Sequence, residues 1–301
     1  MKVKIVSNLI LGPWGGGNQI LKALKNEFVN KSFYTESVSE ADVLVFNSYN
    51  ELTTLVKLFF FSKKKNVLRL GPVFHLYRKG LKWKILDFIT VVVASLFTDL
   101  VIFQSRWSYE QALKLGFSKN KKYSIILNTP DNSIFYKKIF IEVSEKTKLV
   151  YSSWSSNFKK GFGYLKYLDE NLDFSKYEMT FIGNSPLEFK NIKIIKPLSS
   201  KELSAELRNN DMFISLVEDD ACSNALLEGL ASGLPVVALN SGGNPELVGS
   251  AGVLFNNELE LIKSINTVSS DLKRYYDAIS VKNLSILADE YIEAFKQVYE
   301  K

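Results

Sequence analysis

Cysteine and histidine are nearly absent from this chain of 301 residues, which contains one of each, Cys222 and His75. A single cysteine excludes a disulfide within the chain, and this pair of residues is too few for a zinc site built from His and Cys ligands. Sparse cysteine is typical of proteins in a reducing compartment. We therefore expect a cytoplasmic location.

Long hydrophobic runs are also missing. The most apolar stretch, Phe88–Phe97, is about half the length that a membrane-spanning helix requires, and Asp87 and Asp99 flank it closely. We expect it to form a core helix. The opening run Lys2–Ile10 is too brief for the apolar region of a signal peptide and has no cleavage site, so we expect no signal peptide.

The charge is distributed unevenly along the chain. Residues 1–140 hold 21 Lys and Arg against 9 Asp and Glu, or +12, whereas residues 141–301 hold 17 against 23, or −6. Lys57–Lys65 and Arg78–Lys84 mix basic residues with aromatics, as segments that rest on anionic lipid do. The alternative is a solvated basic face above core aromatics. No nucleic-acid-binding module is recognisable, so we expect no nucleic-acid partner.

Short apolar runs alternate with helical patterns along the whole chain, which predicts two α/β layers with parallel sheets. A polar link after the turn 128–131 places the boundary between Asp131 and Lys148, and we expect domains at 1–140 and 141–283 and a last helix at 284–301. The expected strands are Val3–Val6, Val43–Phe46, Val67–Leu70, Leu100–Phe103, Ser124–Leu127, Leu149–Ser152, Met179–Ile182, Ile192–Ile195, Met212–Val217, Val236–Leu239 and Val253–Phe255.

Asp220 and Glu228 stand eight positions apart in the most informative window of the sequence. Asp220 follows a strand, and Glu228 falls in the early turns of a predicted helix, Ser223–Ser232, with Ser223 or Asn224 as its N-cap. A carboxylate accepts two hydrogen bonds and so matches a vicinal diol, which ribose and hexose both offer. Two such groups are suited to holding both ends of a nucleotide sugar. Alternatively, Glu228 only complements the helix dipole and residues 218–220 form a solvated turn.

Two further segments, Gly233–Val237 and Gly242–Glu246, complete a pattern that resembles the nucleotide-sugar site of family 4 glycosyltransferases. That family has two glutamates separated by seven residues, then a Gly-Leu-Pro-Val-Val strand and a Gly-Gly-x-Pro-Glu turn. In this chain Asp220 replaces the first glutamate. The resemblance implies an α/β GT-B fold, in which two Rossmann-like domains present parallel sheets to a central cleft and the C-terminal helix crosses back to the N-terminal domain.

The resemblance also implies roles for individual residues. Glu228 would bind the donor ribose, Asp220 the transferred sugar, and Lys160 the diphosphate. Ser155 stands where the family has an arginine, and Lys159 would supply the second positive charge. His75 is placed near the transferred sugar, and Phe103–Ser105 would line the cleft. The remaining donor-binding candidates are Gly16, Gly17, Cys222, Ser223, Asn224, Gly242 and Gly243.

The implied activity is transfer of a sugar from a nucleoside-diphosphate sugar to an acceptor hydroxyl with retention of configuration, without a metal or other cofactor, in glycan, polysaccharide or glycolipid synthesis. The acceptor would be a saccharide or a lipid-linked glycan, with peripheral contact to an anionic membrane through the basic first half. Three alternatives remain: a metal-dependent transferase that uses Glu218–Asp220, a GT-B epimerase, and a degenerate member that binds sugar nucleotide or membrane without turnover.

Overall fold

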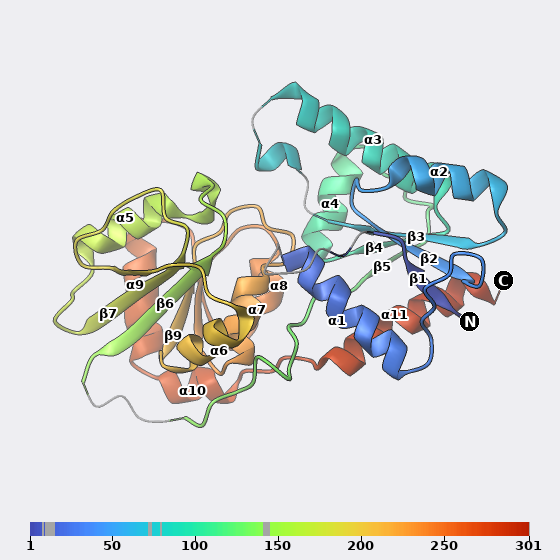
Figure 1. The fold of residues 1–301 in the computed structure, drawn as a ribbon. Helices are drawn as coiled ribbons and strands as arrows, with labels where there is room; N and C mark the ends of the chain where they lie inside the picture. Colours follow the sequence, from blue (N-terminus) through green and yellow to red (C-terminus); the bar gives the residue numbers. More distant parts are fainter. Residues whose placement is uncertain (8, 10–15, 72–73, 79, 141–144, 301) are drawn as a thin grey trace. The chain divides into compact units, whose positions relative to one another are not determined.

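The computed structural model describes residues 1–7, 9, 16–71, 74–78, 80–140 and 145–300. The chain divides into two compact units, one formed by residues 1–128 with 282–301 and the other by residues 129–281 (Figure 1). Residues 129–140, which the sequence assigned to the first domain, belong with the second unit because Phe135 packs into its core and the amide of Lys138 bonds to the carbonyl of Ser232.

The first unit is built on a five-stranded sheet with order β1-β2-β3-β4-β5, in which every neighbouring pair is parallel. Apolar residues fill both faces of its central strands, so the sheet is covered on both sides. The strands are β1 Val3–Ile5, β2 Val43–Asn47, β3 Lys65–Leu70, β4 Leu100–Phe103 and β5 Tyr123–Ile125.

Two hydrophobic clusters flank this sheet. One face packs against α1 (Gly16–Asn30) and α11 (Leu284–Tyr299), so the last helix of the chain returns to the first unit. The other face packs against α2 (Leu52–Phe61), α3 (Leu81–Phe97) and α4 (Arg106–Lys114). A short 3-10 helix, η1 (Phe74–Leu76), precedes α3. None of the helices among the described residues is long and apolar enough to cross a membrane.

Arg69 forms a buried polar hub at the end of β3. Its guanidinium donates hydrogen bonds to one side chain on each of several elements: Asn47 at 2.8 Å, Gln104 at 2.7 Å, Asn128 at 2.8 Å and the Tyr291 hydroxyl at 3.2 Å. All these acceptors are neutral. The hub therefore ties the ends of the sheet's strands to α11 and uses Gln104, which the sequence placed in the lining of a cleft.

The second unit contains a six-stranded parallel sheet with order β11-β10-β9-β6-β7-β8. Its strands are β6 Thr147–Ser153, β7 Tyr177–Gly183, β8 Lys193–Ile195, β9 Met212–Ser215, β10 Val236–Leu239 and β11 Gly252–Phe255. Its helices are η2 Phe158–Lys160, α5 Phe162–Asn171, α6 Ser200–Arg208, α7 Asn224–Ala231, α8 Asn244–Val248, α9 Glu258–Ser269 and α10 Leu272–Asp277.

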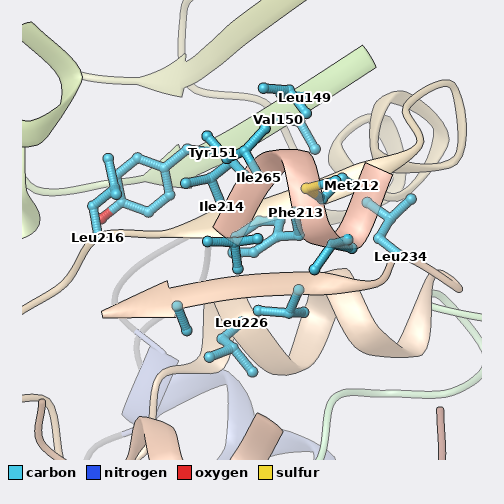
Figure 2. Packing of buried hydrophobic residues seen from close by; sticks show 14 of the residues in the cluster. Leu149, Val150, Tyr151, Met212, Phe213, Ile214, Leu216, Leu226, Leu234 and Ile265 are labelled. Carbon is cyan, nitrogen blue, oxygen red and sulfur yellow. The ribbon is translucent and has the colours of Figure 1, made fainter. Parts of the chain in front are cut away.

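Side chains of β6 and β9 form the centre of the second core. Figure 2 shows Tyr151 and Val150 of β6 beside Phe213 and Ile214 of β9, with Leu226 of α7 packed in the same cluster. Because parallel strands carry their carboxyl ends to one edge, this packing fixes the edge from which the loops after β6, β9 and β10 emerge.

Candidate functional site

The loops that follow three adjacent strands, β6, β9 and β10, meet at the carboxyl edge of the second sheet. These loops and the start of α7 contain the candidate residues that the sequence places between 155 and 243. Strand β9 ends at Ser215, two residues earlier than predicted, because the chain already turns toward the β6 loop: the amide of Glu218 bonds to the carbonyl of Lys159 at 2.9 Å. The three loops therefore form one connected structure.

Three ion pairs, made by two lysines with three carboxylates, join the β6 loop to the β9 loop. The Lys160 ammonium lies 3.1 Å from the Asp220 carboxylate, and the Lys159 ammonium lies 2.7 Å from Asp219 and 3.8 Å from Glu218. All five side chains are partly exposed, so these pairs contribute little to stability on their own. Their main effect is to hold two cations at a fixed place on the edge of the sheet.

Asp220 is held from several sides. One carboxylate oxygen accepts from Lys160 and the other accepts from the amide of Cys222 at 3.2 Å. Its main-chain carbonyl accepts from the amide of Gly243 at 2.8 Å. The side chain that the resemblance assigns to the transferred sugar thus also orients Lys160, a relation that sequence spacing does not reveal.

Gly242 is required by the approach of the β10 loop to this acid. Its φ is +61°, and a Cβ at this position would lie 2.3 Å from the carbonyl oxygen of Asp220. The resemblance gives Gly242 and Gly243 a part in donor binding, and that part stays a prediction. In the structure Gly242 makes room for the neighbouring main chain, and the Gly243 amide is already bonded to Asp220.

Helix α7 begins directly after the acidic loop. Ser223, rather than Asn224, is its N-cap, and the Ser223 hydroxyl accepts from the amide of Leu226 at 3.4 Å. Cys222 and Ser223 are buried, whereas Asn224 is half-buried at the first turn. The helix end therefore presents Asn224 and main-chain amides, and the thiol is packed inside.

Glu228 lies on the same helix, one turn further along. Its side chain is half-buried, and among the described residues its carboxylate has no hydrogen-bond or ion-pair partner. Burial raises the pKa of the Glu228 carboxyl to about 8. An acid that is desolvated without a compensating partner is costly, and such groups are concentrated at functional sites.

The β6 loop is shaped by short-range polar contacts. The Ser155 hydroxyl accepts from the amide of Asn157, whose side chain accepts in turn from the amide of Lys159. The buried Tyr151 hydroxyl donates to the carbonyl of Lys160 at 2.7 Å. Ser155 therefore helps to form the turn that presents the lysines, and its predicted contact with a donor stays a prediction.

Sequence reasoning missed two residues that lock these loops together. The side-chain amide of Asn244, which is fully buried, donates to the carbonyls of Val217 and Leu239 and so connects the β9 and β10 loops. The Ser241 hydroxyl accepts from the amide of Asp219 at 3.0 Å. Asn244 occupies the variable position of the Gly-Gly-x-Pro-Glu pattern, and an asparagine beside two glycines is the one signal that was present.

The candidates of the first unit lie on separate elements. Gly16 and Gly17 are the first residues of α1, and residues 10–15 before them lie outside the described residues. His75 lies in η1, where Asp87 of α3 accepts from its main-chain amide at 2.6 Å and lies 2.9 Å from its Nδ1. This double contact gives His75 a clear structural role, and its predicted place near a sugar stays a prediction.

The described residues contain no group of three or more His, Cys, Asp or Glu side chains placed to hold a metal ion. The acidic run that suggested a metal site, Glu218–Asp220, is directed to the two lysines instead. What the edge offers chemically is a desolvated carboxylate, two fixed cations and the amino end of α7. These groups suit hydroxyl and phosphate recognition.

Part of the chain is similar to known protein sequences. The profile of a family described as glycosyl transferases group 1 matches residues 167–271. An uncharacterized 41.2 kDa protein in the cps region of Klebsiella pneumoniae is 27% identical over 211 residues, and the match covers 65% of this chain but only 59% of that protein. The chain thus spans less than two thirds of this relative.

Solved structures resemble the chain over nearly its whole length. Sucrose-phosphate synthase from Thermosynechococcus elongatus has a TM-score of 0.70 at 13% identity, with 97% of this chain and 83% of that chain covered. Anabaena Alr3699/HepE in complex with UDP and glucose has a TM-score of 0.67 at 16% identity, with 95% and 84% covered. These likenesses confirm the predicted α/β fold class with two parallel sheets, the GT-B type of glycosyltransferase structures.

Proposed function

We propose that this protein is a glycosyltransferase that moves a sugar from a nucleoside-diphosphate sugar to an acceptor hydroxyl with retention of configuration. The observation that carries the proposal is the arrangement at the carboxyl edge of the second sheet. There a half-buried Glu228, which has no partner among the described residues, lies near the capped start of α7 and near Lys160, which is fixed by Asp220. The family match over residues 167–271 covers both Asp220 and Glu228 and supports the same activity.

Glu228 is suited to the ribose of the donor. A ribose presents two adjacent hydroxyls that donate to the two oxygens of one carboxylate. Because Glu228 has no competing partner among the described residues, its oxygens are available for that contact. A diol would replace the hydrogen bonds with water that burial has removed, so donor binding would favour the ionised form of Glu228.

The diphosphate would meet positive charge and main-chain amides. Lys160 is partly exposed, and the amino end of α7 favours anions because its first amides point outward and the helix dipole is positive there. Stabilising the departing nucleoside diphosphate is the largest contribution that such groups make to the transfer. Lys159 would add a second charge in place of the arginine replaced by Ser155.

Asp220 has two tasks in this proposal. It positions Lys160 through the 3.1 Å ion pair, and it would contact the hydroxyls of the transferred sugar with the face that its partners leave open. Its side chain is shorter by one methylene than the glutamate of the resembling family, and the Gly243 amide bonded to its carbonyl holds the residue in place. We name no protein nucleophile, and retention rests on the family resemblance.

The decisive experiment compares the wild type with Glu228→Gln and Glu228→Ala by calorimetric titration with UDP, GDP and ADP. Loss of hydrogen bonds from two ribose hydroxyls to a desolvated carboxylate should weaken binding of the preferred nucleotide by about 10- to 100-fold. Glu170→Gln, an exposed acid on α5, is the matched control and should bind like the wild type. Unchanged affinity in a folded Glu228→Ala protein would refute the assignment.

Assays with nucleotide sugars separate this proposal from its alternatives. Because Asp219 and Asp220 are paired with lysines, we expect transfer to continue in the presence of a chelator. Activity that is lost on chelation and restored by manganese would instead favour a metal-dependent transferase. Isomerisation of the donor without an acceptor would identify an epimerase, and nucleotide binding without transfer to any acceptor would identify a non-catalytic binder.

A further inference from the structure

Helix α3 exposes an apolar stripe on the side that faces away from its sheet. The stripe consists of Leu81, Ile85, Phe88, Ile89 and Leu96, and Leu81 and Leu96 are 72% and 59% exposed. At 1.5 Å per residue it runs for about 22 Å. The sequence predicted a core helix over residues 88–97, which is correct for the buried face, but Phe88, Ile89 and Leu96 remain outside the core.

Lysines border this stripe on both sides. At about 100° per residue, the five exposed apolar residues fall within an arc of about 100°, and Lys82 and Lys84 project beside its two edges. The buried residues of α3, among them Asp87 and Ala94, occupy the opposite side. A central apolar stripe with a cation on each edge matches the cross-section of a helix that lies in the plane of a membrane surface.

Helix α2 extends the apolar surface at the far end of α3. Phe59 and Phe60 contact Phe97 with ring centroids 5.8 and 5.6 Å apart, so the carboxyl ends of the two helices lie together (Figure 1). Phe60 remains largely exposed and the next residue, Phe61, is 83% exposed. We call the exposed apolar residues of both helices, Phe59, Phe60, Phe61, Leu81, Ile85, Phe88, Ile89 and Leu96, the α2–α3 face.

The segment that forms the α2–α3 face is strongly basic. Residues 52–97 contain nine Lys and Arg and a single acid, Asp87. That acid is buried and bonded to His75, so it does not offset the exposed cations. Lys57 and Lys63 are exposed near the phenylalanines, and Arg78, Lys82 and Lys84 are exposed near the start of α3.

Aromatic residues also accompany the cations at the start of α3. The Arg78 guanidinium lies 4.1 Å from the centre of the Trp83 ring and 5.4 Å from that of Phe74, and the Lys82 ammonium lies 5.3 Å from Trp83. Tryptophan and long cationic side chains are the residues that favour the boundary between lipid tails and headgroups, because each has an apolar body and a polar end.

We propose that the α2–α3 face docks on an anionic lipid surface, with its apolar residues inserted between headgroups and its lysines and Arg78 bound to phosphate. Charge selects this occupant: exposed apolar residues accompanied by the exposed cations Lys57, Lys82 and Lys84 match negatively charged headgroups. The proposal goes beyond the transfer activity and does not depend on it. It would bring the first unit to a lipid-linked acceptor, so that the enzyme finds its second substrate in two dimensions.

Vesicle flotation of the full chain tests the proposal. Vesicles of phosphatidylcholine with about 30% phosphatidylglycerol should carry the protein, and pure phosphatidylcholine should carry much less, because each basic residue near an anionic surface strengthens binding roughly fivefold. Ile85→Glu with Phe88→Glu should lower the partition coefficient at least about tenfold. Lys82→Glu with Lys84→Glu should lower it at least about 25-fold on the anionic vesicles.

Matched changes elsewhere serve as controls. Leu259→Glu with Ile286→Glu replaces two exposed apolar residues outside the α2–α3 face, and Lys166→Glu with Lys201→Glu makes the same change in net charge on the second unit. Both should float like the wild type, apart from a small effect of net charge. Thermal unfolding and nucleotide titration on every variant will show that the fold and the donor site are intact.

Three outcomes would overturn the proposal. Equal partition of wild type and both α2–α3 variants would show that the face does not bind lipid. Equal partition onto neutral and anionic vesicles would remove the role of charge. Failure to float, together with self-association in sedimentation velocity that Ile85→Glu with Phe88→Glu abolishes, would assign the face to a second copy of the chain.

Discussion

At the level of single residues, the burial of Glu228 costs stability, and this cost fits the donor-binding role proposed for it. It is desolvated on α7 without a partner among the described residues, whereas the neighbouring Asp220 has a partner on each carboxylate oxygen. The contrast between these two acids is the main residue-level sign of a ligand site. An acid placed only to complement the helix dipole would remain solvated, and the pKa of Glu228 would then not be raised by burial.

The elevated pKa of Glu228 makes stability depend on pH. Its carboxyl titrates near 4.5 when unfolded and near 8 when folded, so the unfolded state releases this proton first. The stability that the protonated form provides is complete below about pH 4.5 and is lost as the pH rises toward 8. Chemical denaturation of wild type and Glu228→Gln between those values should show the wild type losing more stability. Parallel pH profiles would contradict burial of this carboxyl.

At the scale of elements, the return of α11 to the first sheet depends on a polar contact as well as on apolar packing. Leu287, Tyr291 and Phe295 fill the space beside α1, and the Tyr291 hydroxyl accepts from Arg69. Hydrogen-bond acceptors around a buried guanidinium offset the free-energy cost of removing its charge from water. The hub therefore fixes α11 against the carboxyl ends of the strands in the first sheet.

Removing that hydroxyl should weaken the first unit. Tyr291→Phe leaves the ring in place but takes one acceptor from Arg69, and we expect a loss of about 1–3 kcal/mol in the free energy of unfolding. Tyr299→Phe, on the exposed last turn of the same helix, should change it by less than about 0.5 kcal/mol. Urea denaturation measures both. A loss as large for Tyr299→Phe would indicate a general effect of α11 instead of the hub.

In the molecule as a whole, the two units differ in the number of chain segments that form them. The second unit is continuous from Thr129 to Val281, and all the described residues of its core fall within that range. The first unit is interrupted, because residues 282–301 complete the core started by residues 1–128. The second unit therefore has what independent folding requires, whereas the first lacks one wall of its core without α11.

Fragments should reveal this difference. Residues 129–281 expressed alone should unfold in one cooperative thermal transition, because their core is complete. Residues 1–128 alone should remain unfolded or aggregate, since the apolar face beside α1 would be open to water. Adding residues 282–301 through a flexible linker should restore cooperative unfolding, which circular dichroism can follow. A folded 1–128 fragment would show that α11 is dispensable.

The amino-acid sequence alone predicted the α/β class, the approximate strand positions and the candidate window around Asp220 and Glu228, because periodicity, caps and glycine turns are local. Only the tertiary structure paired Lys160 with Asp220, placed Gly242 against a neighbouring loop, buried Glu228 without a partner in the described part of the chain, and formed the hub of Arg69. It also showed that one side of the apolar helix α3 is exposed. Each of these features depends on which distant segments come into contact. A local run of apolar or charged residues does not predict those contacts.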